Sequence, residues 1–187
     1  MKMNRLQTAV LIAACSMTVL LRTQDLPLHL DSMIALALLC GAVVRHPIAV
    51  LIPLGVRLLT DLVLWSETGY GFYPSIVLDY AAYLLIAVLA RFVPLPKAAT
   101  MIGGGLVGPV LFFLISNFGV WSMWPETYPH TISGLLSCYA QGLPFLRDSL
   151  IGNAPFALLF LAAWHVATVS APAESLTVAG ADSQQDA

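Results

Sequence analysis

The sequence has few charged residues. Asp, Glu, Lys and Arg make up only 10% of its 187 residues, whereas roughly a quarter is usual in a soluble domain. Hydrophobic residues make up 59%, so we expect the chain to fold with lipid as its solvent. The formal net charge of -2 includes no excess of basic residues. We therefore expect no nucleic-acid partner.

Motifs that carry catalysis or cofactor binding are also missing. The three cysteines have no metal-type spacing, and no zinc-binding pair of histidines stands on one helix face. The glycine-rich stretch 103–109 lacks the Gly-Lys-Ser/Thr that holds phosphate. Ser133 lacks the glycine two positions earlier that an intramembrane serine protease needs. We expect no cofactor, no metal and no enzyme. The remaining candidates for catalysis would be His130, Cys138 and Asp79.

Apolar runs of membrane-spanning length are abundant. They predict an all-α, polytopic membrane protein with about six transmembrane helices, near 6–21, 32–44, 47–64, 76–92, 99–118 and 149–169. The segment 131–143 has helical spacing but is too short to span, so we expect it to lie in the interface or re-enter. Residues 1–170 form a single domain in this interpretation, and 171–187 form a disordered cytoplasmic tail.

The first apolar run has an alternative interpretation as a cleaved signal. Residues 12–15, ending in Cys15, resemble a lipoprotein cleavage box. The run stays apolar up to Leu21, where a mature lipoprotein would turn polar, so we favour a retained helix.

Lys and Arg are distributed unevenly between the two sides of the predicted helices. Only Arg22 and Arg147 fall on the side opposite the termini. Basic residues accumulate on the cytoplasmic side of membrane proteins. Both termini are therefore expected in the cytoplasm, with the protein in a bacterial inner membrane. The basic residues on the side of the termini are Lys2, Arg5, Arg45, Arg91 and Lys97.

Polar residues within the predicted spans suggest a binding site. With this topology, Arg57, Asp61, Asp79, Asn117 and Asn153 all reach one depth, in the outer part of the bundle. Ionisable groups inside a membrane are costly and face a partner or a cavity. A ligand pocket is one explanation. The alternative is that Arg57 and Asp61, four residues apart, form only a structural ion pair.

An aromatic segment is expected to cover this depth. Residues 116–148 contain three prolines and are dense in aromatic and polar side chains. We expect them to form a lid over the outer mouth of the bundle. Trp121, Tyr128 and Tyr139 would complete the ligand-binding set, although interfacial tryptophans are also common without a ligand.

Several motifs resemble a known family. They are RLLTDLVL around Asp61, YGFY at 70–73, FFLISNFGVW, YPHTISGLLSCY, and LPFLRDSLIGN ending at Asn153. The chain from about 38 to 161 is similar to an uncharacterised bacterial family of six-helix membrane proteins linked to transport. Its size and layout also resemble the substrate-binding S components of energy-coupling-factor transporters.

The resemblance implies a function and partners. It implies a membrane transport protein whose substrate-binding subunit takes a small organic molecule or ion. It also implies energy-coupling transmembrane and ATPase subunits as partners, besides membrane lipid. Small residues on the first helix dock on the transmembrane partner in those transporters, and Ala9 and Ala13 would take that role here. The alternatives are a structural or assembly protein that binds a periplasmic partner, and, third, an intramembrane enzyme.

Overall fold

The described part of the chain is helical throughout. The computed structural model describes residues 3–24, 31–44, 46–94 and 97–170, and no strand occurs among them. This confirms the all-α fold class. The helices are α1 (Arg5–Thr23), α2 (Met33–Leu38) with the π-helical η1 (Leu39–Val43), the 3₁₀-helical η2 (Pro47–Leu51) with α3 (Ile52–Thr68), α4 (Ile76–Phe92), α5 (Lys97–Met123) and α6 (Ile132–Val169).

Four helical segments are long and apolar enough to cross a membrane. They are Arg5–Thr23, Pro47–Thr68, Lys97–Met123 and Ile132–Val169. The remaining two are shorter: α4 has 17 residues, and α2 with η1 runs only from Met33 to Val43. A membrane protein with several spans is therefore supported, whereas the count of six stays a prediction.

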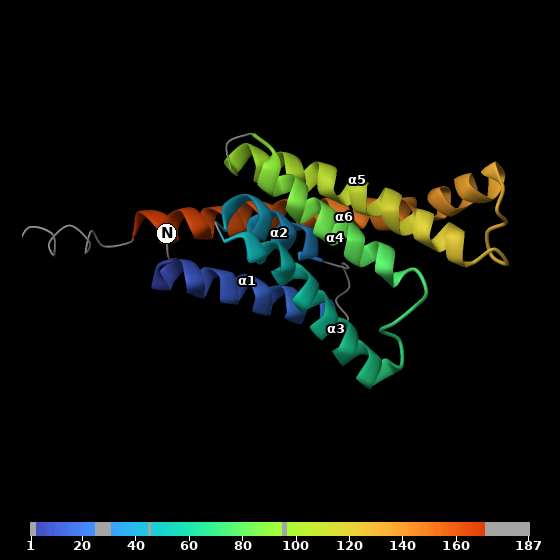
Figure 1. The fold of residues 1–187 in the computed structure, drawn as a ribbon, viewed down its shortest axis with the longest axis horizontal. Helices are drawn as coiled ribbons and strands as arrows, with labels where there is room; N and C mark the ends of the chain where they lie inside the picture. The colour runs from blue at the N-terminus through green and yellow to red at the C-terminus, as the bar shows by residue number, and fades with distance from the viewer. Residues whose placement is uncertain (1–2, 25–30, 45, 95–96, 171–187) are drawn as a thin grey trace, which may run out of the picture.

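Successive helices run back and forth between two ends of an elongated bundle (Figure 1). At one end lie the α3–α4 connection, residues 69–75, and the α5–α6 turn, residues 124–131. We call this the hairpin end. At the other end, which we call the terminal end, the start of α1 lies close to the end of α6. The Asn4 Nδ2 donates a hydrogen bond to the Ala167 carbonyl there, at 3.0 Å.

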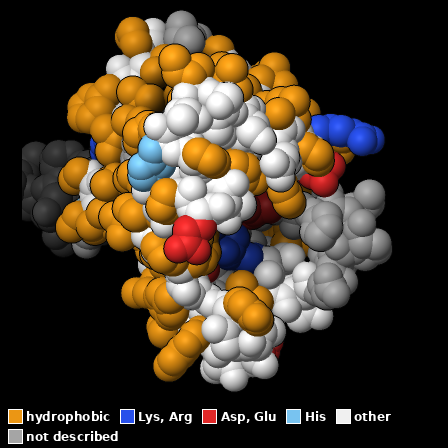
Figure 2. All heavy atoms as spheres, turned by 90° about the vertical axis from the view of Figure 1, so that its right-hand side faces the viewer, with side chains coloured by type: hydrophobic (Ala, Val, Ile, Leu, Met, Phe, Trp, Pro, Cys, Tyr) orange, Lys and Arg blue, Asp and Glu red, His pale blue; other side chains and the backbone are white. Residues whose placement is uncertain are grey.

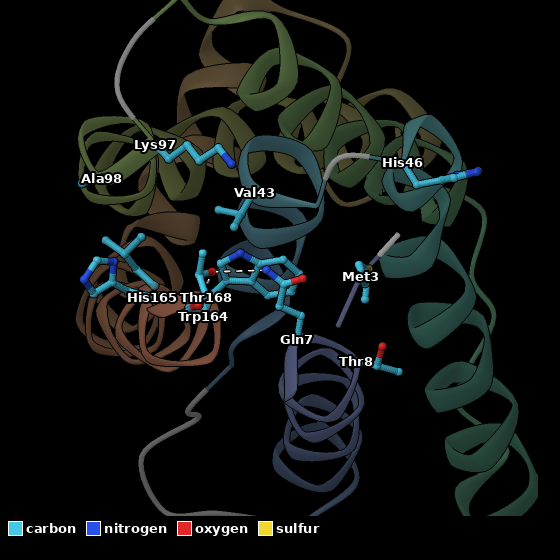
Figure 3. A pocket seen from close by; sticks show the side chains of 11 residues that line it. Met3, Gln7, Thr8, Val43, His46, Lys97, Ala98, Trp164, His165 and Thr168 are labelled. Carbon is cyan, nitrogen blue, oxygen red and sulfur yellow. Dashed lines mark hydrogen bonds between the residues drawn. The ribbon is translucent and has the colours of Figure 1, made fainter. Parts of the chain in front are cut away.

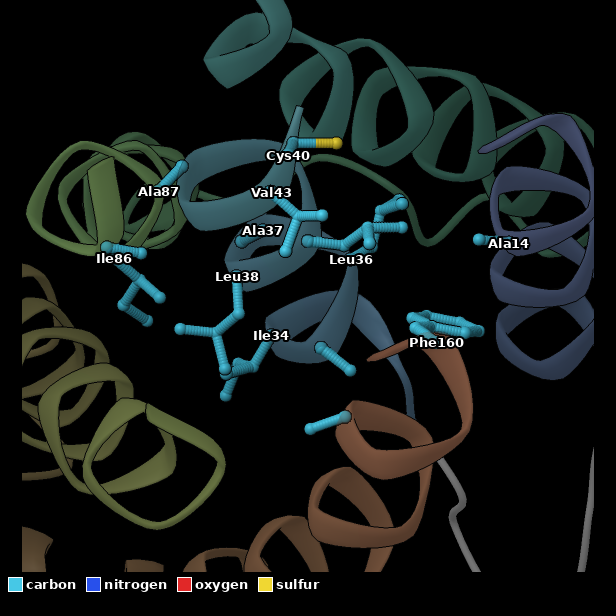
Figure 4. Close-up of a cluster of buried hydrophobic side chains, with 14 of the residues drawn as sticks. Ala14, Ile34, Leu36, Ala37, Leu38, Cys40, Val43, Ile86, Ala87 and Phe160 are labelled. Carbon is cyan, nitrogen blue, oxygen red and sulfur yellow. The ribbon is translucent and has the colours of Figure 1, made fainter. Parts of the chain in front are cut away.

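The short helix α2 lies at the centre of the bundle and is surrounded by the others. All six of its residues are buried, which explains why it is apolar on every side. Figure 4 shows its side chains and those of η1 between α4, α1 and α6. Gly41 of η1 permits the closest approach, since a β-carbon there would overlap the Ala87 carbonyl oxygen of α4.

The predicted separate interfacial helix at 131–143 is wrong. Thr131 caps the start of α6 by accepting a hydrogen bond from the Gly134 N–H, and the helix then continues to Val169. Pro144 and Pro155 lie inside it. Prolines are tolerated within membrane helices because neighbouring groups satisfy the freed carbonyls, so they did not mark helix ends here. Residues 116–148 are thus the tip of an α5–α6 hairpin. The predicted tail, 171–187, lies outside the described residues.

Candidate functional site

A buried ion pair lies on α3, in the half of the bundle nearest the hairpin end. The Arg57 Nε donates to the Asp61 Oδ2 at 2.8 Å, one helical turn away. Both residues are almost fully buried, at 3% and 1% exposure. The structural pairing that the spacing suggested is therefore present. A pair at this depth needs further hydrogen bonds to offset the loss of solvation of both charges.

The second partner of Arg57 comes from the α3–α4 connection. The Arg57 Nη2 donates to the Tyr73 hydroxyl at 2.9 Å, and that hydroxyl donates to the Asp79 Oδ2 of α4. Arg57 also lies 3.6 Å from Asp79. Burial raises the pKa of Tyr73 to about 12, so this phenol keeps its proton and donates to Asp79. Tyr73 therefore links a cation of α3 to a carboxylate of α4.

A second arginine, Arg22 of α1, approaches Asp61. The Arg22 Nη2 donates to the Asp61 Oδ1 at 3.1 Å, and its Nε donates to the Thr60 hydroxyl at 2.9 Å. Tyr80 of α4 donates its hydroxyl proton to the Asp61 Oδ2 at 2.9 Å. Asp61 thus accepts from three helices. Such a network fixes the side chains rigidly before any ligand binds.

A cavity of about 590 Å³ lies beside this network. Figure 2 views the molecule from the hairpin end and shows a hollow with basic and acidic side chains at its floor. Residues of α1, α3, α4, α5 and α6 contribute to its wall. Its polar lining residues include Arg22, Asp31, Arg57, Tyr73, Ser75, Asp79, Tyr83, Ser116, Asn117, Tyr128 and Gln141. A concave space with apolar walls and a few fixed polar groups is the usual form of a small-molecule site.

One polar group in this wall has no partner. Ser75 is 1% exposed, and among the described residues its Oγ is the one buried side-chain nitrogen or oxygen without a hydrogen bond. Leaving a buried hydroxyl unsatisfied costs about 1–3 kcal/mol. Because Ser75 lines the cavity, a molecule bound there can supply the missing partner.

Four of the eight predicted ligand-binding residues line this cavity, namely Arg57, Asp79, Asn117 and Tyr128. A fifth, Asp61, lies behind them and holds both arginines in place. It lines a smaller cavity of about 150 Å³ beneath the α3–α4 connection. Four of the five polar residues predicted to lie at one depth therefore border these two neighbouring cavities, and Asn153 does not.

The other three predicted residues do not line the cavity. The Trp121 Nε1 donates to the Pro129 carbonyl at 3.0 Å, which closes the α5–α6 turn. Tyr139 donates its hydroxyl proton to the Leu114 carbonyl at 2.8 Å and joins α6 to α5. Asn153 is fully buried and accepts from the Ala35 N–H at 3.3 Å, which joins α6 to the start of α2. Each of the three connects helices.

Several residues of the cavity wall were not among the predicted ligand-binding residues, and Arg22, Tyr73 and Ser75 matter most among them. All three lie just outside the predicted spans 6–21 and 76–92. The available signal was position: Tyr73 and Ser75 immediately precede the predicted helix that carries Asp79. Arg22 gave a weaker signal, as a single cation at the end of an otherwise apolar run.

The catalytic candidates are engaged in other contacts. The Cys138 thiol contacts the Asn117 carbonyl oxygen at 3.4 Å, and the His130 ring packs on Trp121 at 5.1 Å. Among the described residues no three His, Cys, Asp or Glu side chains are grouped so as to hold a metal ion. The arrangement can bind and orient a molecule through charges and hydrogen bonds.

A larger cavity of about 820 Å³ lies at the terminal end. Figure 3 shows Lys97 extending over its middle, while His46 and His165 lie on opposite sides and point away from each other. All three are exposed. The buried charges and the unpartnered hydroxyl are at the hairpin end instead. We therefore take the hairpin-end cavity of about 590 Å³ as the candidate site, although the terminal-end cavity is larger.

Comparison with known proteins gives one match. A model described as a family of unknown function, DUF6580, matches residues 2–175. No curated protein matches the chain, and no solved structure does.

Proposed function

Since the chain belongs to this family of unknown function, we propose its role from the site alone: it is a membrane protein that binds a small organic molecule or ion in the hairpin-end cavity, as the substrate-binding subunit of a transport system. The observation that carries the proposal is the cavity wall itself. It combines Arg57 and Asp79, buried and fixed by partners, with the unpartnered hydroxyl of Ser75.

The cost of this wall supports a binding role. Two arginines and two aspartates in one membrane bundle require several kcal/mol of desolvation to be offset. A purely structural cluster would be expected to close on itself. Here Arg22, Arg57 and Asp79 border an open volume that can hold a small organic molecule. Function as a receptor explains both the buried charges and the space beside them.

The test is to block the cavity and look for the ligand. Val120 of α5 lines the cavity, whereas Val110 of the same helix is 38% exposed on the outer face. Mass spectrometry of small molecules released from purified wild type and from Val110→Trp should show the same compound at similar occupancy. Val120→Trp should lose it. A compound whose occupancy is unaffected by Val120→Trp, or no compound in any sample, would contradict the proposal.

The proposal includes a docking partner that supplies energy. Ala9 and Ala13 both face outward on α1, on the side not packed against the bundle. Small exposed residues on a membrane helix allow another helix to approach closely. The partner that we propose is an energy-coupling transmembrane subunit, itself bound to an ATPase.

Orientation and the number of spans complete the proposal. We propose that α2 with η1 and α4 also traverse the membrane core within the bundle. Because basic residues accumulate on the cytoplasmic side, we also propose that the hairpin end faces the periplasm. Reporter fusions at Gly69 and Trp124 should then give periplasmic signals, and a fusion at Pro96 a cytoplasmic one. A cytoplasmic signal at Trp124 would reverse the orientation and remove the outward-facing site.

A further inference from the structure

A smaller cavity of about 190 Å³ adjoins the candidate site. The two share Asp31, Phe112, Ser116, Asn117 and Phe145 in their walls. We propose that together they bind a positively charged ligand, a small organic cation of the ammonium type. This inference rests on the proposed function and narrows it to one class of substrate.

The first argument is the charge of the smaller cavity. Asp31 and Asp148 both line it, and no Lys, Arg or His does so among the described residues. The Asp31 Oδ1 accepts from the Met33 N–H at the start of α2, so its second oxygen stays available. Asp148 has no hydrogen-bond or ion-pair partner in the described part of the chain. Two carboxylates in a confined space attract a cation.

The second argument is the charge of the whole site. The arginines of the main cavity are already engaged: Arg22 pairs with Asp61, and Arg57 pairs with both Asp61 and Asp79. Asp61 lies behind the wall, so two arginines are set against three aspartates that line the joined cavities and a fourth, Asp61, behind them. The excess is negative and comes from Asp31 and Asp148, which form no ion pair with any described residue, whereas Asp61 and Asp79 do. A ligand with one positive charge reduces this excess, whereas an anion increases it.

The third argument is aromatic. Phe112, Phe113 and Phe145 line the smaller cavity, and the Phe112 ring packs against Tyr83 at 4.7 Å between centroids. Aromatic faces attract cations, and they recognise substituted ammonium groups in particular. A methylated ammonium needs such apolar walls, because its positive surface donates no strong hydrogen bond.

An independent observation lies in the main cavity. The Ser75 Oγ is buried without a partner among the described residues, and Ser75 lines the main cavity. A hydroxyl or N–H on the uncharged part of the ligand would satisfy it. The site therefore fits a molecule with an ammonium head beside Phe112 and Phe145 and a short polar tail that reaches Ser75.

The test compares probes of one shape and different charge. Choline, its neutral isostere 3,3-dimethylbutan-1-ol and the anion 3,3-dimethylbutanoate are titrated into the purified protein, with tetramethylammonium as a second cation. The expected result is binding of choline about tenfold or more tighter than the neutral isostere, and no binding of the anion. Equal binding of the neutral probe, tighter binding of the anion, or no binding of either cation would overturn the inference.

Matched variants locate the effect. Asp148→Asn should weaken choline binding about fivefold or more, and Asp31→Asn should do the same while keeping its acceptor for Met33. The control is Glu126→Gln, which removes an exposed acid from the α5–α6 turn outside both cavities. Loss of binding in Glu126→Gln as large as in Asp148→Asn would overturn the inference. If a neutral or anionic compound co-purifies and depends on Val120, the proposed function stands and only the charge inference fails.

Discussion

Each end of the bundle holds a cavity. The cavity at the terminal end is larger, but it has fewer of the features of a binding site than the cavity at the hairpin end. At the terminal end, Lys97, His46 and His165 are exposed, and the polar contacts join helices, as between Gln7 and Thr168 at 3.2 Å. At the hairpin end, buried charges are held by partners from three helices. Affinity depends on groups that are ordered before binding. The hairpin-end cavity is therefore the better candidate site, although its volume is smaller.

The strongest test of this comparison removes one cation from each end. Arg57→Gln leaves Asp61 and Asp79 buried without their shared cation, so we expect a loss of about 3–5 kcal/mol of unfolding free energy. Lys97→Gln removes an exposed charge and should change stability by less than about 0.5 kcal/mol. Chemical unfolding in mixed micelles measures both. Similar losses at the two ends would show that the hairpin-end charges are not a preorganised wall.

A second pair of variants, with a smaller expected effect on stability, separates polar residues that hold helices together from those that line the cavity. Asn153→Ala leaves the Ala35 N–H without its side-chain acceptor, which should cost about 1–3 kcal/mol. Occupancy by the co-purifying ligand should stay unchanged after correction for the folded fraction. Asn117→Ala is the paired variant, since Asn117 lines the cavity, and it should lower occupancy. Loss of ligand in Asn153→Ala at full folding would return Asn153 to the site.

The helices of this fold were largely predictable from the sequence. The bounds of α4 agree with the predicted 76–92, because apolar spacing and the residues flanking it both mark its ends. The continuous α6 was not predicted, because prolines end helices in water and the predicted segment 131–143 stops before Pro144, which lies inside α6. Local sequence gives no sign that neighbouring helices will satisfy the freed carbonyls.

The site was predictable in part for a related reason. Arg57, Asp61 and Asp79 are rare charges in apolar runs, and that cost alone identified them. Tyr73 and Ser75 lie in a connection where polar residues are ordinary, so their inward direction could not be inferred. Asn153 carried the same signal as a site residue, yet it bonds α2. A polar residue within an apolar run can be recognised from the sequence as costly to bury, but whether its side chain faces a cavity or another helix depends on packing.

A third test uses the unpartnered hydroxyl. Ser75→Ala removes a buried oxygen that bonds nothing in the described structure, so the unliganded protein should be as stable as wild type or more stable by up to about 1 kcal/mol. Ligand occupancy should fall in the same variant. The control is Ser66→Ala, an exposed serine of α3, which should leave occupancy unchanged. A drop in unliganded stability in Ser75→Ala would mean that the hydroxyl has a structural partner, and the cavity would lose its main sign of a ligand.

The smallest expected effect on stability concerns the outward face of α1. Ala13→Leu adds an apolar side chain at an exposed position, so the change in stability should stay within about 0.5 kcal/mol. A bulky side chain there would prevent a partner helix from approaching closely. We therefore expect that an affinity-tagged wild type retains a transmembrane subunit and its ATPase on purification in mild detergent, and that Ala13→Leu does not. Ala162→Leu, an exposed alanine of α6, is the matched control and should retain both.

The chain lacks a phosphate-binding loop, so the protein alone in liposomes should bind its ligand without accumulating it. Accumulation by the lone protein under a proton gradient would contradict the need for a partner, and the Ala9–Ala13 face would then serve only for contact with lipid.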